Sequence, residues 1–228
     1  MPLPKEVTFV TFDVYGTLID SDTGIYEAFS KEAEKDGYTI ARDELIALFK
    51  ETQKEIKSGS YELYAEVLRR TAVQISKQLG WPLEPSRSGF LPDSVARWAP
   101  FKETAAQIKK FHADKNIGVG LISNVDDKLL GLTRRHIPGD FDLVVTAQQV
   151  RSYKPDPAHF KECARRIGPT KKNWVHIASG YPTDIEPAIK EKIPVIWVNR
   201  HGEEIEGGRK PDAEVKTFRD AGKLLKAA

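Results

Sequence analysis

The chain has 228 residues, 40% of them hydrophobic, which is enough to bury one substantial core or one core with a smaller appendage. The 35 lysines and arginines nearly balance the 33 acidic residues, so the net charge of +2 gives no reason to expect a nucleic-acid partner. No run approaches the ~18 uninterrupted apolar residues that span a bilayer, and no apolar leader precedes the first strand, so we expect a cytoplasmic protein without a membrane partner.

The first predicted strand ends in a carboxylate. Residues 7–12 are β-branched and aromatic, which predicts a buried strand, and Asp13 follows them directly. The carboxyl ends of strands form the edge of an open α/β sheet at which ligands bind. Taken alone, Asp13 could equally form a turn or cap a helix. Its function therefore depends on the residues that other strands bring to the same edge.

Residues 20–97 show helical rather than strand periodicity. Three amphipathic helices are expected, and a short fourth one follows a break at 81–85. Ser60 is the expected N-cap of the third helix, and Gly80 its end. The apolar positions of the three helices are Ile25, Phe29 and Ala33, then Leu45, Leu48, Phe49 and Ile56, then Leu63, Tyr64, Val67 and Leu68. This interval predicts a helical subdomain inserted into another fold.

From Pro100 onward, strands and helices alternate. Near-continuous apolar runs predict strands at 117–123, 141–146, 174–178 and 195–198, and amphipathic segments predict helices around 105–111, 126–135, 158–167 and 185–190. This alternation predicts the α/β class, with a Rossmann-like parallel sheet covered by helices on both faces. Right-handed crossovers then bring all strand ends to one edge. Residues 202–210 read as a polar surface loop.

Four short motifs at these strand ends are similar to those of the haloacid dehalogenase superfamily. Asp13-Val14-Tyr15-Gly16-Thr17 resembles the first motif, whose aspartate is a covalent nucleophile in that superfamily. Residues 121–124, 152–157 and 176–185 resemble the second, third and fourth motifs. The resemblance implies a core domain of residues 1–19 and 98–228, and a helical cap domain of residues 20–97 that closes over the nucleophile.

The resemblance implies a role for each motif residue. Asp13 would attack the substrate, and Lys154 would neutralise the charge around Asp13 and keep it ionised. Asp184 and Ser179 would hold Lys154 or orient a water molecule. Thr17 and Ser123 would bind oxygens of the nucleophile or substrate, and Asn124 and the backbone amides of Val14 and Tyr15 would bind the substrate carboxylate. From the residues alone, Ser123 and Asn124 could also form a turn, and Lys154 could be a solvated surface residue.

Two positions favour a metal-independent branch of this superfamily. Its phosphatases usually carry a second aspartate as general acid where this chain has Tyr15, a phenol with an ordinary pKa near ~10. They also hold magnesium with two acidic residues in the fourth motif, where this chain has Gly180 and then Asp184 alone. The Asp-x-Tyr form is that of the 2-haloacid dehalogenases, whose halide leaves without a proton. We therefore expect no cofactor; under a phosphatase alternative, Asp13 and Asp184 would hold magnesium.

Three positions depart from the dehalogenase pattern. Arg42 lies near the place of an arginine that holds the departing halide, but its neighbours differ. Phe160 stands where dehalogenases have a tyrosine, and Tyr181 stands where they have an asparagine. Arg42 and Tyr181 are retained as substrate-binding candidates. Segments 23–25, 146–148 and 152–155 are also similar to a branch that contains an azetidine-2-carboxylate hydrolase.

The sequence thus predicts a hydrolase that acts on a small 2-substituted carboxylate through an aspartyl ester on Asp13, without a metal. One alternative is a magnesium-dependent phosphatase of the same superfamily. A second alternative, from another class, is a non-catalytic binding protein that keeps the fold, although such a protein would not need the set Asp13, Thr17, Ser123, Lys154 and Asp184. The expected partner is a small anionic carboxylate, and the resemblance adds a homodimer.

Overall fold

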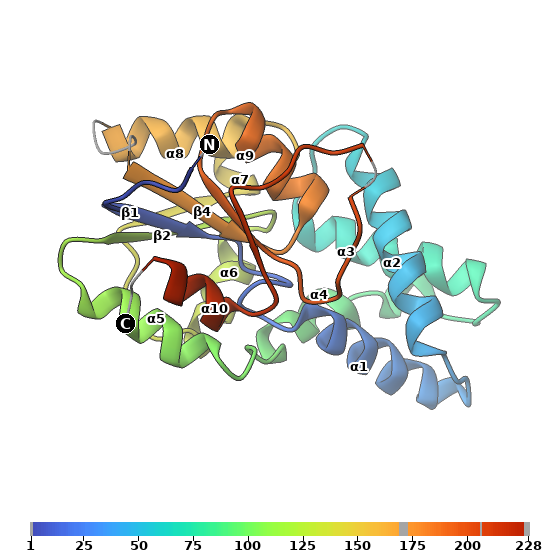
Figure 1. The fold of residues 1–228 in the computed structure, drawn as a ribbon. Helices are drawn as coiled ribbons and strands as arrows, with labels where there is room; N and C mark the ends of the chain where they lie inside the picture. The colour runs from blue at the N-terminus through green and yellow to red at the C-terminus, as the bar shows by residue number, and fades with distance from the viewer. Residues whose placement is uncertain (1, 169–172, 206, 226–228) are drawn as a thin grey trace.

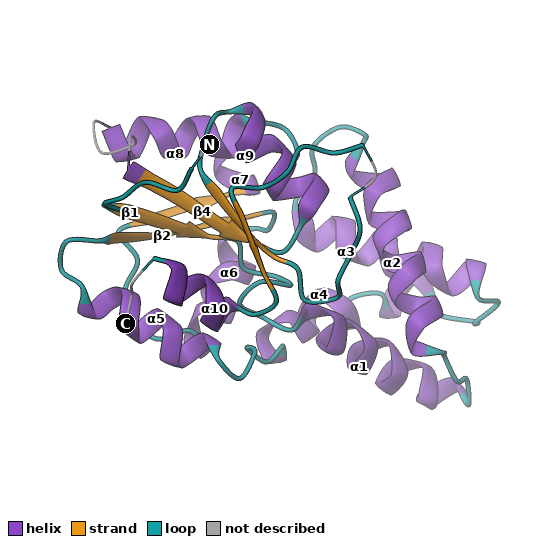
Figure 2. Cartoon of the chain, in the orientation of Figure 1, coloured by secondary structure: helices purple, strands orange, loops and turns teal. Residues whose placement is uncertain are grey.

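The computed structural model describes residues 2–168, 173–205 and 207–225. In this part of the chain, six parallel strands form one sheet in the order β3-β2-β1-β4-β5-β6 (Figure 1). Helices cover both faces of the sheet, and a further group of helices lies to one side (Figure 2). The predicted α/β class with a parallel sheet is confirmed. The strands are β1 (Phe9–Phe12), β2 (Gly118–Ser123), β3 (Leu143–Thr146), β4 (Trp174–Ala178), β5 (Val195–Val198) and β6 (Ala213–Val215).

Strand β1 lies in the middle of the sheet, as its apolar sequence requires. Val10, Thr11 and Phe12 are completely buried. β1 pairs with β2 on one side and with β4 on the other, so the order of strands along the chain reverses at β1. Such a switch point opens a crevice beyond the carboxyl ends of the strands. Asp13 stands at this point, and its amide donates to the Ile177 carbonyl at 3.1 Å.

Helices with apolar inner faces cover the two sides of the sheet, α5 and α10 on one side and α8 and α9 on the other (Figure 1). On the first side, the Phe12 ring lies 5.1 Å from that of Phe111 and 5.4 Å from that of Phe218. Burial of each such side chain contributes about 1.5–3 kcal/mol. The helices are α5 (Thr104–Ala113), α6 (Asp127–Thr133), α7 (Ala147–Val150), α8 (Ala158–Ile167), α9 (Glu186–Lys190) and α10 (Phe218–Leu224).

The segment that follows β1 is helical up to residue 97, as predicted. Its helices pack on one another around an aromatic cluster, in which the Phe29 ring lies 5.1 Å from Phe90 and 6.3 Å from Trp81. The division into a core domain and a cap domain at residues 20–97 stays a prediction. The helices are α1 (Ser21–Ala33), α2 (Arg42–Lys57), α3 (Tyr64–Gln78) and α4 (Phe90–Ser94), with 3-10 turns at Glu34–Asp36, Pro85–Arg87 and Val95–Arg97.

The predicted N-cap of the third helix is wrong. Helix α3 begins at Tyr64 rather than next to Ser60. Its cap comes from Asp126, whose carboxylate accepts hydrogen bonds from the amides of Tyr64 and Ala65 at 2.7 and 2.8 Å. A carboxylate at a helix N-terminus satisfies free N–H groups and complements the helix dipole. Because Asp126 follows β2, this cap also ties the helical region to the edge of the sheet.

The C-terminal part contains elements that the periodicity did not predict. Strand β6 pairs with β5 at the sheet edge, and helix α10 follows it. The strand predicted at 141–146 begins only at Leu143, because Asp142 instead bonds the backbone of Val119 through its amide and its carboxylate. The surface loop at 202–210 is confirmed for the residues described there; residue 206 lies outside them.

The two connections between the sheet and the helical region run side by side. The amide of Asp20 donates to the Ala99 carbonyl at 2.9 Å, and Phe101 donates to Leu18 at 3.0 Å. The Thr104 hydroxyl adds a third bond, to the Leu18 carbonyl at 2.7 Å.

None of the described helices combines the length and the apolar character needed to cross a membrane.

Candidate active site

Asp13 begins a tight loop that folds back on itself. The amides of Leu18 and Ile19 donate to the Val14 carbonyl at 2.8 and 2.9 Å. Gly16 has φ 85°, and a Cβ on it would lie 3.0 Å from the Ser179 hydroxyl, so this turn requires glycine. The fold of this loop brings the Thr17 hydroxyl to within 2.9 Å of Asp13 Oδ2.

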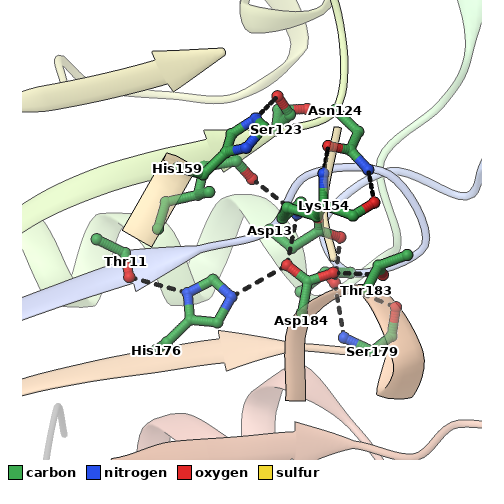
Figure 3. A network of polar contacts seen from close by, with 12 residues as sticks. Thr11, Asp13, Ser123, Asn124, Lys154, His159, His176, Ser179, Thr183 and Asp184 are labelled. Atoms are coloured by element: carbon green, nitrogen blue, oxygen red, sulfur yellow. Dashed lines mark hydrogen bonds and ion pairs between the residues drawn. The ribbon is translucent and has the colours of Figure 1, made fainter. Parts of the chain in front are cut away.

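Lys154 joins two carboxylates at the switch point (Figure 3). Its Nζ donates to Asp13 Oδ1 at 2.9 Å and to Asp184 Oδ1. Asp13 follows β1, Lys154 follows α7, and Asp184 lies in the irregular helical turn after β4. All three are nearly inaccessible, with Asp13 only 7% exposed. The parallel sheet therefore brings together three of the predicted catalytic residues, as expected for strand-end positions.

The three charges of this cluster are not equivalent. Burial raises the pKa of Asp13, Asp184 adds to the rise, and the Lys154 ammonium opposes it without cancelling it. Burial acts on Asp184 in the same sense, but Lys154 and a hydrogen bond from His176 outweigh it and hold the pKa of Asp184 below its usual range. Burial alone would lower the pKa of Lys154, but the two carboxylates raise it. Lys154 thus stays charged, yet it does not by itself keep Asp13 as readily ionised as a free aspartate.

A line of hydrogen bonds through the sheet supports Asp184 (Figure 3). The Trp174 indole donates to Thr11 Oγ1 at 2.7 Å, Thr11 Oγ1 lies 2.9 Å from His176 Nδ1, and His176 Nε2 lies 3.2 Å from Asp184 Oδ1. An indole N–H can only donate, so Thr11 Oγ1 accepts from Trp174 and donates its own proton to His176 Nδ1. His176 Nε2 then carries the imidazole proton and donates it to Asp184. Thr183 donates to the other oxygen of Asp184 at 2.7 Å.

Asn124 holds the backbone of Lys154. Its amide oxygen accepts from the Lys154 amide at 2.7 Å, and its amide nitrogen donates to the Lys154 carbonyl at 3.1 Å. The side chain predicted to bind a substrate carboxylate is therefore engaged in positioning the lysine. The neighbouring Ser123 hydroxyl is buried and has no hydrogen-bond partner in the described part of the chain. A buried hydroxyl without a partner is uncommon, which makes Ser123 a candidate for binding a substrate oxygen.

Ser179 joins the nucleophile loop to the turn after β4. Its amide donates to Thr17 Oγ1 at 2.9 Å, and its hydroxyl lies 3.1 Å from the same atom. Thr17 therefore links Ser179 to Asp13. In the same loop, the Tyr15 hydroxyl is 2.7 Å from Thr133 Oγ1. Burial raises the pKa of Tyr15 well above the usual value of a phenol. The amides of Val14 and Tyr15 stay predicted substrate ligands.

Two predicted substrate-binding residues are occupied elsewhere. Arg42 is exposed, donates to the Thr23 hydroxyl at 2.9 Å, and lies over the Tyr26 ring at 5.4 Å. Tyr181 packs on Trp197 and donates its hydroxyl to the Arg209 carbonyl at 2.8 Å. Neither side chain joins the cluster around Asp13 through a described contact. The Arg42 prediction came from its approximate place along the chain and the Tyr181 prediction from its place in the fourth motif, and neither fixes the direction of a side chain.

Arg200 binds the backbone of the loop that follows Asp13, and it was not identified from the sequence. Its guanidinium donates to the carbonyls of Gly16 and Thr17 at 3.3 and 2.8 Å and pairs with Glu103 at 2.7 Å. It also lies 3.6 Å above the Phe101 ring. Arg200 follows β5, so the rule that strand ends meet at one edge could have identified it. His176, inside β4, gave no comparable signal.

The donor set does not fit a magnesium ion. The Lys154 ammonium lies between Asp13 and Asp184, the two carboxylates that were expected to hold the metal under the phosphatase alternative. Gly180 adds no carboxylate, and a Cβ there would lie 2.3 Å from Thr183 Oγ1 and 3.0 Å from Asp184 Oδ2. Within the described ranges, no group of at least three His, Cys, Asp or Glu side chains could hold a metal.

The sheet topology and the polar cluster at its switch point define an α/β enzyme of the Rossmann-like type. The family model for haloacid dehalogenase-like hydrolases matches residues 7–190, and the chain belongs to that family. The resemblance stated from the four motifs is thereby confirmed, and the protein is a hydrolase.

Curated relatives and solved structures agree with this assignment at low identity. An (S)-2-haloacid dehalogenase of Pseudomonas putida is 24% identical over 86% of each chain. A glyceraldehyde 3-phosphate phosphatase of Methanothermobacter thermautotrophicus is 28% identical over 83% of this chain and 84% of its own. The structure of an L-2-haloacid dehalogenase from Xanthobacter autotrophicus with chloropropionic acid covalently bound has a TM-score of 0.82 at 18% identity and covers 96% of this chain and 98% of its own. That likeness shows the shared fold.

Proposed function

We propose that the protein hydrolyses a small carboxylate that carries a leaving group on its α-carbon, such as a 2-haloacid, through an ester on Asp13 and without a metal. The observation that carries this proposal is the environment of Asp13. Lys154 and Thr17 bond its two oxygens, both at 2.9 Å, while Tyr15 stands where a phosphatase needs an acid. The Pseudomonas putida relative, named a haloacid dehalogenase, supports the choice of substrate class.

In the first half-reaction, a carboxylate oxygen of Asp13 attacks the α-carbon in line with the leaving group. The new carbon–oxygen bond forms as the bond to the leaving group breaks, and a halide departs with the electron pair. Lys154 and Thr17 hold the Asp13 carboxylate in one orientation, which removes much of the entropic cost of attack. The low exposure of Asp13 keeps water away from it before substrate arrives.

In the second half-reaction, water attacks the ester carbonyl carbon of Asp13. The bond from that carbon to the substrate oxygen breaks, so the product is a 2-hydroxy acid that keeps an oxygen from Asp13. Asp13 regains its carboxylate with one oxygen from water, and one proton is released. Lys154 stabilises the negative charge that develops on the carbonyl oxygen, and Asp184 and Ser179 fix Lys154 and Thr17 in place.

Tyr15 favours a leaving group that needs no proton. Its hydroxyl is bonded to Thr133 at 2.7 Å, and its raised pKa makes it a poor acid. A halide departs as a stable anion, whereas a departing alkoxide must be protonated. A ring nitrogen that is already protonated, as in azetidine-2-carboxylate, would satisfy the same requirement.

The phosphatase alternative has one finding in its favour, the 28% identical relative that is named a phosphatase. It would require magnesium to bind close to the Lys154 ammonium, through the second oxygens of Asp13 and Asp184, which accept hydrogen bonds from Thr17 and Thr183. It would also require another source of the proton for the leaving alkoxide. These two requirements place it second.

The proposal is tested by turnover in ¹⁸O-water followed by mass spectrometry of the peptide that contains Asp13. (S)-2-chloropropionate and azetidine-2-carboxylate are assayed separately with EDTA present, and Asp13→Asn is the matched control. Label in the Asp13 peptide, together with halide or ring-opened product, is the expected result. Product without label would contradict the ester. Turnover of phosphate esters only, and only with magnesium, would establish the second candidate instead.

A further inference from the structure

Lys57 is a cation in an unusual setting. It is the last residue of α2, and its Nζ lies 4.7 Å from the centre of the Tyr64 ring and 5.4 Å from the centre of the Tyr153 ring. No carboxylate pairs with it in the described part of the chain. Aromatic faces attract a cation but do not satisfy its three hydrogen-bond donors. Lys57 thus has a defined position and unused capacity to bind an anion.

The two rings connect Lys57 to the active site. Tyr153 directly precedes Lys154, and Tyr64 is the first residue of α3, whose amide is capped by Asp126. The Tyr153 hydroxyl also donates to the Glu62 carbonyl at 2.9 Å, which fixes this ring against the loop between α2 and α3. The Lys57 ammonium is therefore held next to the carboxyl edge of the sheet.

Electrostatic coupling supports this placement. Burial, together with the Lys154 ammonium, lowers the pKa of Lys57 to about 7, although Asp13 opposes the change. The titratable groups that face Lys57 come from three parts of the chain: Tyr64 on α3, Tyr153 and Lys154 after α7, and Asp13 after β1. The charge of Lys57 is thus coupled to those of both Asp13 and Lys154.

The charge of the cluster makes such a cation necessary for an anionic substrate. Asp13 and Asp184 carry two negative charges and Lys154 one positive charge, which leaves one net negative charge in a buried site. A second anion entering this environment is repelled unless another cation meets it. Arg42, the arginine suggested by the sequence, is exposed and bonded to Thr23.

We propose that Lys57 binds the carboxylate of the substrate, with the rings of Tyr64 and Tyr153 holding its side chain in place for this contact. The identity of the anion as an α-substituted carboxylate rests on the proposed function. Arrival of the carboxylate gives the Lys57 ammonium the partner that it lacks, so binding favours its charged form and raises its pKa. Lys57 thus selects for substrates with a carboxylate and helps to place the α-carbon against Asp13.

The direct test is titration of Lys57 in the wild-type protein, followed by NMR of ¹³C-labelled lysine side chains, with the signal assigned by its loss in Lys57→Gln. Propionate, which has no leaving group, serves as the probe, and inorganic phosphate as the comparison. We expect propionate at millimolar concentration to raise the pKa of Lys57 and phosphate to have less effect. An unchanged titration with propionate, or a larger shift with phosphate, would overturn the proposal.

Steady-state kinetics with (S)-2-chloropropionate provide a second test of the role of Lys57. Lys57→Gln should lower kcat/KM by about 30-fold, whereas Lys57→Arg, which keeps the charge, should lose much less. Lys54→Gln, an exposed lysine on the same helix, is the matched control and should leave kcat/KM unchanged. If the wild-type protein turns over this substrate and Lys57→Gln has the same kcat/KM, the role of Lys57 is refuted and the proposed function still stands. No turnover of any 2-substituted acid, with a propionate-dependent pKa still observed, would refute the function and leave the carboxylate site standing.

Discussion

The carboxyl edge of the sheet and the end of helix α2 beside it differ in how their charged side chains are partnered. At the sheet edge, Asp13, Lys154 and Asp184 bond one another, and Thr11 and His176 continue the network. At the end of α2, Lys57 contacts the rings of Tyr64 and Tyr153 and pairs with no carboxylate among the described residues. The first arrangement is complete within the chain, and in our proposal the carboxylate of the substrate completes the second. The difference suggests that the sheet edge supplies the chemistry while the helical region recognises what enters.

Removal of the nucleophile should have the largest effect and should separate activity from stability. We expect Asp13→Asn to lower kcat by at least about 10³-fold, because the ester cannot form. The same change should raise the free energy of unfolding at pH 7 by about 1 kcal/mol, because the buried network loses a charge that burial and Asp184 disfavour. Urea unfolding and steady-state kinetics measure the two quantities. A destabilised variant would mean that Asp13 is held more favourably than this reasoning allows.

Loss of the Lys154 ammonium should lower both the stability of the fold and the activity. Lys154→Met leaves Asp13 and Asp184 buried without a cation, which should lower the free energy of unfolding by about 3–5 kcal/mol and abolish turnover. The double variant Lys154→Met with Asp13→Asn should recover part of the stability and none of the activity. Thermal unfolding of both variants at one pH checks this coupling. Equal stability of the single and double variants would contradict it.

The pH dependence should distinguish the two carboxylates. Activity requires ionised Asp13, whose pKa is raised, so kcat/KM should fall on the acid side at a pH above the ordinary range of an aspartate. Asp184 has a lowered pKa in the fold, so its contribution to stability is present above the pKa of an unfolded aspartate and is lost as the pH falls towards its folded value.

Activity should therefore disappear at a pH where circular dichroism still reports a folded protein. A pH–rate profile and thermal melts over the same range make the comparison. Activity that persists down to the pH of acid unfolding would show that the pKa of Asp13 is not raised.

The smallest effect should come from the contact between the two regions. Asp126→Asn keeps only one of the two hydrogen bonds to the α3 amides, sets an NH2 donor against the other amide and removes the charge, so the free energy of unfolding should fall by about 1–2 kcal/mol. Because Asp126 is not bonded to Asp13 or Lys154, kcat should change less than KM. Asp127→Asn, at the neighbouring position, is a comparison that leaves the α3 cap intact. A loss of kcat as large as that of Lys154→Met would mean that Asp126 belongs to the chemical cluster.

The sequence predicted the parts of this site that follow from strand ends. Asp13 directly follows β1, and Lys154 and Asp184 lie in the connections that leave the carboxyl ends of β3 and β4, so the parallel sheet brings all three to one edge. Lys57 and Asp126 were not predicted because each is placed by a contact with a residue far along the chain. In the sequence alone, a lysine at the end of an amphipathic helix is expected to be solvated. Strand β6 was not predicted because its three residues are too few to show an alternation of apolar and polar side chains.

The low exposure of Asp13 also bears on the speed of the enzyme. With the α3 cap on Asp126 and the Tyr153 bond to Glu62 both in place, the nucleophile is 7% exposed. We expect these bonds to break when the proposed substrate enters and when its product departs. The frequency of that opening sets a ceiling on turnover, so solvent viscosity should slow a good substrate more than a poor one.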